Sequence, residues 1–213
     1  MTTTPITQAR TVDPRAAALL ARWAIRYAAG RATGAFQEAL TLSYRVAPHA
    51  TAAERDALIA EAERAAEIAY RLESERSTWA NTGEGRSWTA LIDRLRAIDG
   101  DGDDELVDVG LGRALALCAN SAVRRLTGFD LSSGDGTRED DEAVAAACAA
   151  TAPQFSPSDR VLMMRDLYER HSAMLADGGL PRPWCELYAT LAGMELDQSY
   201  LRHSRVPVSL GDA

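Results

Sequence analysis

The chain has 213 residues and a formal net charge of -8, and all 23 of its basic residues are arginine. Without a lysine it can form no Schiff base and contain no Walker A loop. Its acidic balance and lack of a basic cluster argue against nucleic-acid binding as the main role, because that affinity comes from neutralising phosphates.

An all-α fold is expected from the composition. Much of the 46% apolar share is alanine, which has the best intrinsic helix propensity, and β-branched runs are absent. We expect one domain over residues 13–204, a bundle-like array of about six to eight helices. Residues 1–12 are expected to form a flexible tail and residues 205–213 an irregular one.

The cysteines and the apolar runs bear on the cellular compartment. Cys118, Cys148 and Cys185 are scattered and form no CxxC pair, which is typical of reduced thiols. The N-terminal residues lack the apolar stretch of a secretory signal, and no apolar run approaches membrane-spanning length. The sequence therefore predicts a cytoplasmic protein that does not enter a membrane.

The first helix is expected to begin at Asp13-Pro14, an N-cap followed by proline at the first helical position. A second helical stretch ends near Pro48, and the sequence leaves open whether Gly30 and Gly34 separate the two. Thr51-Ala-Ala-Glu54 is a capping box, which predicts the start of a long helix that extends toward Trp79.

The middle of the chain predicts a short helix from Ser87, an acidic glycine-rich loop at residues 99–104, and a helix over residues 105–126. This last helix is the most apolar, so we expect it to be central and buried. Gly128 is its expected C-terminal cap.

After a polar loop at residues 131–138, three further helices are expected at about 139–151, 157–177 and 183–203. No internal repeat is evident to the eye, and no segment shows the alternation expected of a strand.

Four carboxylates form the candidate metal site. Glu63 and Glu67 are spaced i and i+4, and Glu105 and Asp108 are spaced i and i+3, so each pair is predicted to share one helix face. Carboxylates from two packed helices suit Mg²⁺ and, through it, nucleotide phosphates.

The same residues carry a family resemblance over about residues 58–131. The segment AERAAEIAYRL resembles the glutamate-rich helix, and DELVDVGLGRALALCANSAVRRLTGFDL the second motif, of the all-α MazG-like nucleoside triphosphate pyrophosphohydrolases. The resemblance implies Mg²⁺-dependent hydrolysis between the α and β phosphates. Glu63, Glu67, Glu105 and Asp108 are then the implied metal ligands.

A second candidate site is aromatic. Trp79 and Trp88 flank a glycine-containing loop and, with arginines such as Arg94 and Arg124, are candidates to line a ligand pocket. The alternative is that these tryptophans fill the core of an alanine-rich protein.

Three functions therefore stay open. The first is a regulatory or accessory role through protein–protein contacts, with the chain as a homo-oligomer. The second is the Mg²⁺-dependent pyrophosphohydrolase, with a nucleotide as its partner. The third is a metal-independent enzyme or small-molecule-binding protein with a pocket lined by tryptophan and arginine.

Overall fold

The computed structural model describes residues 11–28, 34–73, 83–98, 106–107, 110–128 and 137–210, and these form an all-α fold. Their nine α-helices exceed the expected six to eight by one. The helices are α1 Pro14–Ala28, α2 Gly34–Val46, α3 Ala52–Glu73, α4 Gly83–Arg96, α5 Gly112–Leu126, α6 Arg138–Thr151, α7 Pro157–Ala173, α8 Arg182–Ala192 and α9 Gln198–Ser204. None of the described helices has the length and hydropathy of a membrane-spanning segment.

Short elements connect the helices. The 3₁₀ turns η1 Ala47–His49, η4 Ala152–Gln154 and η5 Leu175–Asp177 follow α2, α6 and α7. Two short strands, β1 Thr11–Val12 and β2 Leu106–Val107, pair in antiparallel fashion, with Thr11 opposite Val107 and Val12 opposite Leu106.

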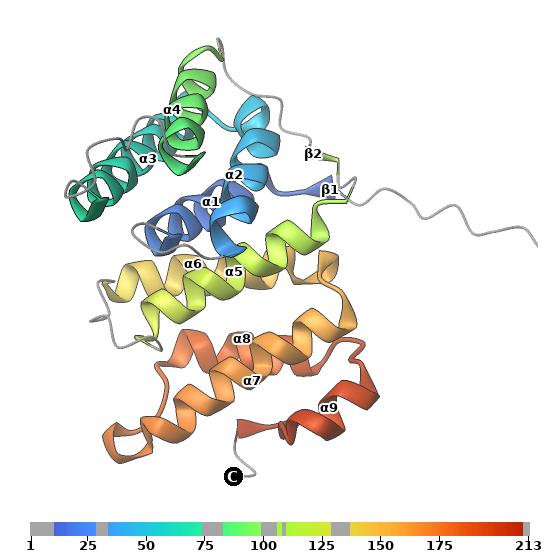
Figure 1. Ribbon diagram of the computed structural model, residues 1–213. Helices are drawn as coiled ribbons and strands as arrows, with labels where there is room; N and C mark the ends of the chain where they lie inside the picture. The colour runs from blue at the N-terminus through green and yellow to red at the C-terminus, as the bar shows by residue number, and fades with distance from the viewer. Residues whose placement is uncertain are drawn as a thin grey trace, which may run out of the picture.

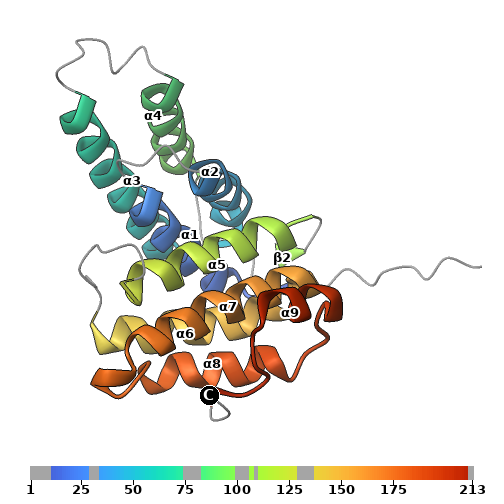
Figure 2. The ribbon, with the colours of Figure 1, turned by 60° about the horizontal axis from the view of Figure 1, so that its bottom comes forward.

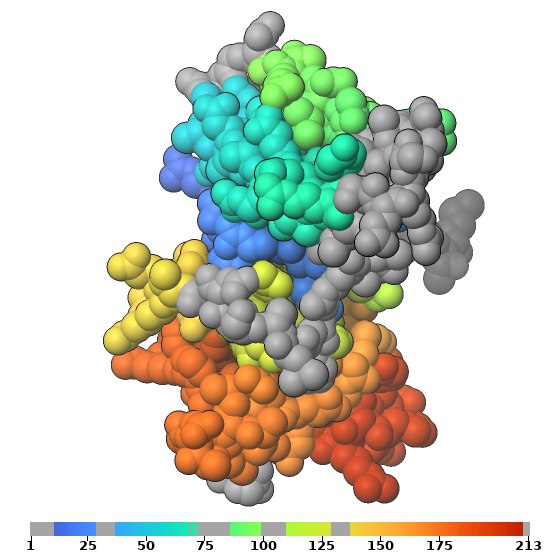
Figure 3. All heavy atoms as spheres, turned by 60° about the vertical axis from the view of Figure 1, so that its left-hand side comes forward, coloured from blue at the N-terminus to red at the C-terminus, as the bar shows by residue number. Residues whose placement is uncertain are grey.

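The helices are stacked (Figures 1 and 2). The pair α3 and α4 lies at one end, α1 and α2 follow, then α5 and α6, and α7 and α8 lie at the other end with α9 beside α7. Figure 3 shows the same order on the surface, from α3 and α4 to α7 and α9. Trp23, Trp88 and Trp184 are fully buried in the core between these helices.

The start of α5 corrects the helix predicted over residues 105–126. Leu106 and Val107 lie in β2, and α5 begins only at Gly112. Gly110 has a φ of +76°, a left-handed conformation that interrupts a helix. Glu105 and Asp108, which were predicted to share one helix face, themselves lie outside the described part of the chain.

Other boundaries also differ from expectation. Thr11 and Val12, placed in the N-terminal tail, belong to β1, and Val12 is buried. The first helix ends at Ala28 and the next begins at Gly34, so two separate helices form. The single helix predicted at about 183–203 is divided into two helices, α8 and α9. Asp197 is the N-cap of α9, and its side chain accepts a hydrogen bond from the Tyr200 backbone N–H at 3.0 Å.

The chain contains an internal repeat, contrary to the expectation from the sequence. In residues 11–96, the first repeat, the order is β1, α1, α2, η1, α3, α4. In residues 106–192, the second repeat, the order is β2, α5, α6, η4, α7, α8, with the additional turn η5 between α7 and α8. The helices α1 and α5 each have 15 residues, and seven positions are identical: Arg15/Arg113, Ala16/Ala114, Ala18/Ala116, Leu19/Leu117, Ala21/Ala119, Ala24/Ala122 and Arg26/Arg124.

The connection after the second helix repeats as well. Ala-Pro opens η1 and η4, and a hydroxyl residue then caps the following helix: Thr51 with Glu54, and Ser156 with Asp159. The next residue is a buried arginine in both repeats, Arg55 and Arg160, which donates to backbone carbonyls of the connection. The capping box predicted at Thr51 is thus confirmed.

The fourth helix carries the pattern Arg-x-Trp-x-x-Leu-x-x-x-Leu in both repeats. In α4 these are Arg86, Trp88, Leu91 and Leu95, and in α8 Arg182, Trp184, Leu187 and Leu191. The tryptophan and both leucines are buried in each helix. The repeat therefore extends over all four helices.

The two repeats pack through equivalent surfaces. Helix α1 packs on α6 as α5 packs on α2, and α1 and α5 pack on each other. The antiparallel β1–β2 pair is reciprocal in the same way, because each strand pairs with the equivalent strand of the other repeat. This reciprocal pattern is that of an isologous interface, here formed within one chain.

Candidate functional site

The predicted metal ligands are only partly described. Glu63 on α3 forms an ion pair with Arg96 on α4, and Glu67 pairs with Arg71 one helical turn later; all four side chains are largely exposed. Two of the four implied ligands are thus bound to arginine, an arrangement that does not itself form a metal site. Among the described residues there is no group of three His, Cys, Asp or Glu side chains placed to hold a metal. The Mg²⁺ site stays a prediction.

The predicted aromatic pocket is not assembled from its described members. Trp88 is fully buried in the core, and Trp79 lies outside the described residues. Arg94 lies over the ring of Tyr44 on α2, 4.8 Å from its centroid, whereas Arg124 pairs with Asp166 on α7. Arg94 and Arg124 therefore lie in different repeats, and Trp88 is a core residue, which was the alternative to a pocket role.

Two of the grooves on the described surface lie at equivalent places of the two repeats. The groove between α2 and α4 has a volume of about 470 Å³, and the groove between α6 and α8 about 480 Å³. The first is lined by Gln37, Leu40, Thr41, Tyr44, Arg86, Ser87 and Ala90. The equivalent positions of the second repeat, in the same order, are Glu142, Ala145, Ala146, Ala149, Arg182, Pro183 and Glu186, and all seven line the second groove.

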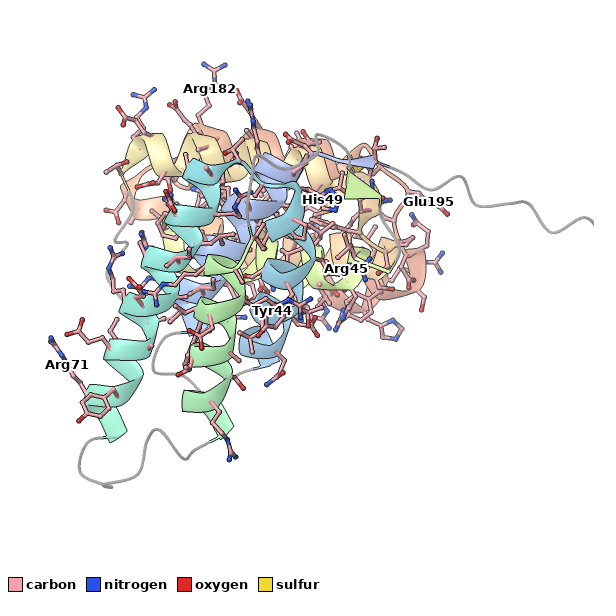
Figure 4. All side chains as sticks on the ribbon, turned by 90° about the horizontal axis from the view of Figure 1, so that it is seen from above. Tyr44, Arg45, His49, Arg71, Arg182 and Glu195 are labelled. Atoms are coloured by element: carbon pink, nitrogen blue, oxygen red, sulfur yellow. The ribbon has the colours of Figure 1, made fainter. Side chains whose placement is uncertain are left out.

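The floors of the grooves differ in the size of their side chains. Alanines at positions 145, 146 and 149 form the floor of the α6/α8 groove, where the α2/α4 groove has Leu40, Thr41 and Tyr44. Figure 4 looks down on α2 and α4 and shows where Tyr44 lies. The two grooves thus share a location in the repeat while presenting different surfaces.

The rims carry the charge of both grooves. Arg182 pairs with Glu186 at 2.7 Å along α8, and Arg138 with Glu142 at 3.0 Å along α6. Figure 4 shows Arg182 extending away from the molecule. The α2/α4 groove keeps the equivalent arginine, Arg86, which makes no ion pair with any described residue.

Asp141 on α6 lies beside the second groove, next to Glu142. The side chain of Asp141 on α6 interacts with that of the buried Trp184 on α8. Burial raises the pKa of Asp141 above its ordinary value, an effect that the Trp184 hydrogen bond partly opposes and that the charges of Asp140 and Glu142 reinforce. A carboxylate with a raised pKa therefore lies next to the Glu142 rim of this groove.

A buried carboxylate joins the first and third helices of each repeat. Glu61 accepts from Arg26 and Arg64, and Asp166 from Arg124 and Arg165. Both carboxylates are at most 4% exposed. Because each is already matched by two arginines, these clusters serve the packing of α1 on α3 and of α5 on α7.

Comparisons with protein-family models, with curated proteins and with solved structures found no match for this chain. The resemblance to MazG-like pyrophosphohydrolases stays a prediction.

Proposed function

We propose that this protein is a docking protein, in which the groove of each repeat receives a helical segment of a partner protein. One observation carries the proposal: the same seven positions line a groove of nearly the same volume in both repeats. The side chains at these positions differ in all but the arginine, so the groove persists although its lining has changed.

The shape of the grooves favours a helix over a small molecule. Small-molecule sites enclose most of their ligand, whereas both grooves are open to solvent along one side. Small floor residues such as Ala145 and Ala149 allow the axis of an incoming helix to approach closely. An amphipathic helix would place its apolar face on this floor and its polar face in water.

The proposal is the regulatory or accessory role predicted from the sequence, placed in the cytoplasm. The isologous packing of the two repeats already supplies a two-fold arrangement within one chain. Docking therefore needs no second copy, and the predicted homo-oligomer is a separate proposal that sedimentation at several protein concentrations would measure.

Selection from a displayed library of random 15-residue peptides tests the docking proposal. Peptides selected on the wild-type protein are measured against Thr41→Arg, which fills the α2/α4 groove, and Ala146→Arg, which fills the α6/α8 groove. Both positions are exposed on their helices. Each peptide is expected to lose about tenfold or more in affinity, roughly 1.4 kcal/mol, in one of the two variants.

Ala150→Arg is the matched control, because Ala150 is exposed on α6 but does not line the groove. Its affinity for every selected peptide should equal that of the wild type. The proposal is wrong if no peptide is selected, or if the selected peptides bind both groove-filling variants as tightly as the control.

A further inference from the structure

The two grooves differ in charge in a specific way. In the α6/α8 groove two rim arginines face two rim glutamates of the same helices, Arg138 with Glu142 and Arg182 with Glu186. At the positions equivalent to Glu142 and Glu186, the α2/α4 groove has Gln37 and Ala90. Both carboxylates are thus missing from the first repeat, while one of the two arginines is kept, as Arg86 at the position of Arg182.

The described lining of the α2/α4 groove is consequently cationic. Among the described side chains that line it, Arg86 is the one charged residue, and it pairs with no carboxylate in that part of the chain. A second cation lies next to the groove, since Arg94 covers the ring of Tyr44. Leu40 and Tyr44 add an apolar surface beside these charges.

Resting on the docking function, we infer that the α2/α4 groove receives an acidic helix, whose carboxylate takes the place that Glu186 has beside Arg182. Complementary charge at the rim selects the partner and speeds its encounter, and like charge rejects the wrong one. The apolar side chains of the helix pack on Leu40 and Tyr44. The α6/α8 groove, whose arginines are already matched, receives a helix without an excess of acid.

The test isolates one groove at a time. Random 15-residue peptides are selected on Ala146→Arg, in which only the α2/α4 groove is open, and separately on Thr41→Arg, in which only the α6/α8 groove is open. Peptides from the first selection are expected to be enriched in Asp and Glu relative to those from the second. Their affinity should also fall as salt is raised, because the rim pair is exposed.

Two rim variants then locate the charge effect. Arg86→Glu should weaken the acidic peptides at least tenfold, and Ala90→Glu, which restores the glutamate of the second repeat, at least threefold. Arg182→Glu is the matched control and should leave these peptides unchanged. Arg86, Ala90 and Arg182 are all exposed, and an unchanged melting temperature verifies that the variants fold.

The outcomes separate the inference from the function on which it rests. If the peptides selected on Ala146→Arg have no excess of acidic residues but lose affinity in Thr41→Arg, the inference of an acidic helix is overturned and the docking function stands. Acidic peptides whose affinity for the Arg86→Glu variant equals that for the wild type would also overturn it. Peptides that bind independently of both groove-filling variants would overturn docking itself.

Discussion

Arg26 on α1 and Glu61 on α3 form a bidentate ion pair, with Nε donating to Oε1 at 3.1 Å and Nη2 to Oε2 at 2.7 Å. The second repeat has Arg124 on α5 and Asp166 on α7 at the equivalent positions. A buried carboxylate is costly unless it is paired, so each pair specifies how the first helix of a repeat meets the third. These ion pairs therefore fix the packing of the first helix on the third in each repeat, and each groove lies between the other two helices of its repeat.

Glu61→Gln and Asp166→Asn should each lower the free energy of unfolding by about 2 kcal/mol, because each leaves arginine donors without their charged acceptor. Urea denaturation measures the loss. Glu63→Gln is the control: its ion pair with Arg96 is exposed, so the expected change is within about 0.5 kcal/mol. Equal losses in all three variants would contradict the distinct role of the buried pairs.

Leu91→Ala and Leu187→Ala should destabilise the protein by similar amounts, about 2–5 kcal/mol each, because the two leucines are buried at equivalent positions of α4 and α8. Thermal and urea unfolding of the two variants checks this. A large loss for one leucine and none for the other would mean that the repeats do not have equivalent cores.

Gly110→Ala distinguishes the predicted helical conformation at residue 110 from the observed left-handed turn. In a helix interior, alanine would stabilise the protein by about 1 kcal/mol relative to glycine. At the observed φ of +76°, alanine should instead cost about 1–2 kcal/mol, and no atom lies within 4 Å of the added Cβ to obscure this effect. The sign of the change in urea denaturation decides between the two conformations.

The three thiols should differ in reactivity. Cys118 and Cys148 are fully buried, which raises the pKa of each thiol, while Cys185 is partly exposed with a pKa raised by burial to a lesser extent. Titration with an aromatic disulfide should detect one thiol in the folded protein and three in urea. Cys185→Ser should abolish the native reaction; rapid reaction of a second thiol would contradict this packing.

Asp141→Asn tests the raised pKa of the carboxylate beside the second groove. The pKa of Asp141 is higher in the folded protein than when unfolded, mainly through burial, so its contribution to stability decreases as pH rises from about 3.8 through the folded pKa. Asparagine has nearly the same shape as aspartate and does not titrate. The stability of the variant relative to the wild type should therefore increase with pH over this interval, and a difference independent of pH would refute the shift.

Local signals in the sequence were sufficient for the helices and for some of their ends. The Thr51–Glu54 capping box and Gly128, with a φ of +66°, lie where their residue types predict. The start of α5 was not predictable in this way, because β2 forms only through pairing with β1, far away in the chain.

The repeat and its grooves needed the structure for a different reason. The segment between α5 and α6 is longer than that between α1 and α2, so the shared residues do not align at one spacing. The Arg-x-Trp-x-x-Leu-x-x-x-Leu pattern of α4 and α8 was the signal that would have revealed it. The grooves depend on which faces of α2 and α4 meet, and that is decided by packing.

The most direct test of the docking account is to locate a bound peptide by photo-crosslinking. A selected peptide carrying a photoreactive leucine analogue is irradiated with the wild-type protein, and mass spectrometry identifies the modified residues. Docking in the grooves should lead to modification of α2 and α4, or of α6 and α8, at residues that line the two grooves. Modification confined to α3, α7 or α9 would contradict it.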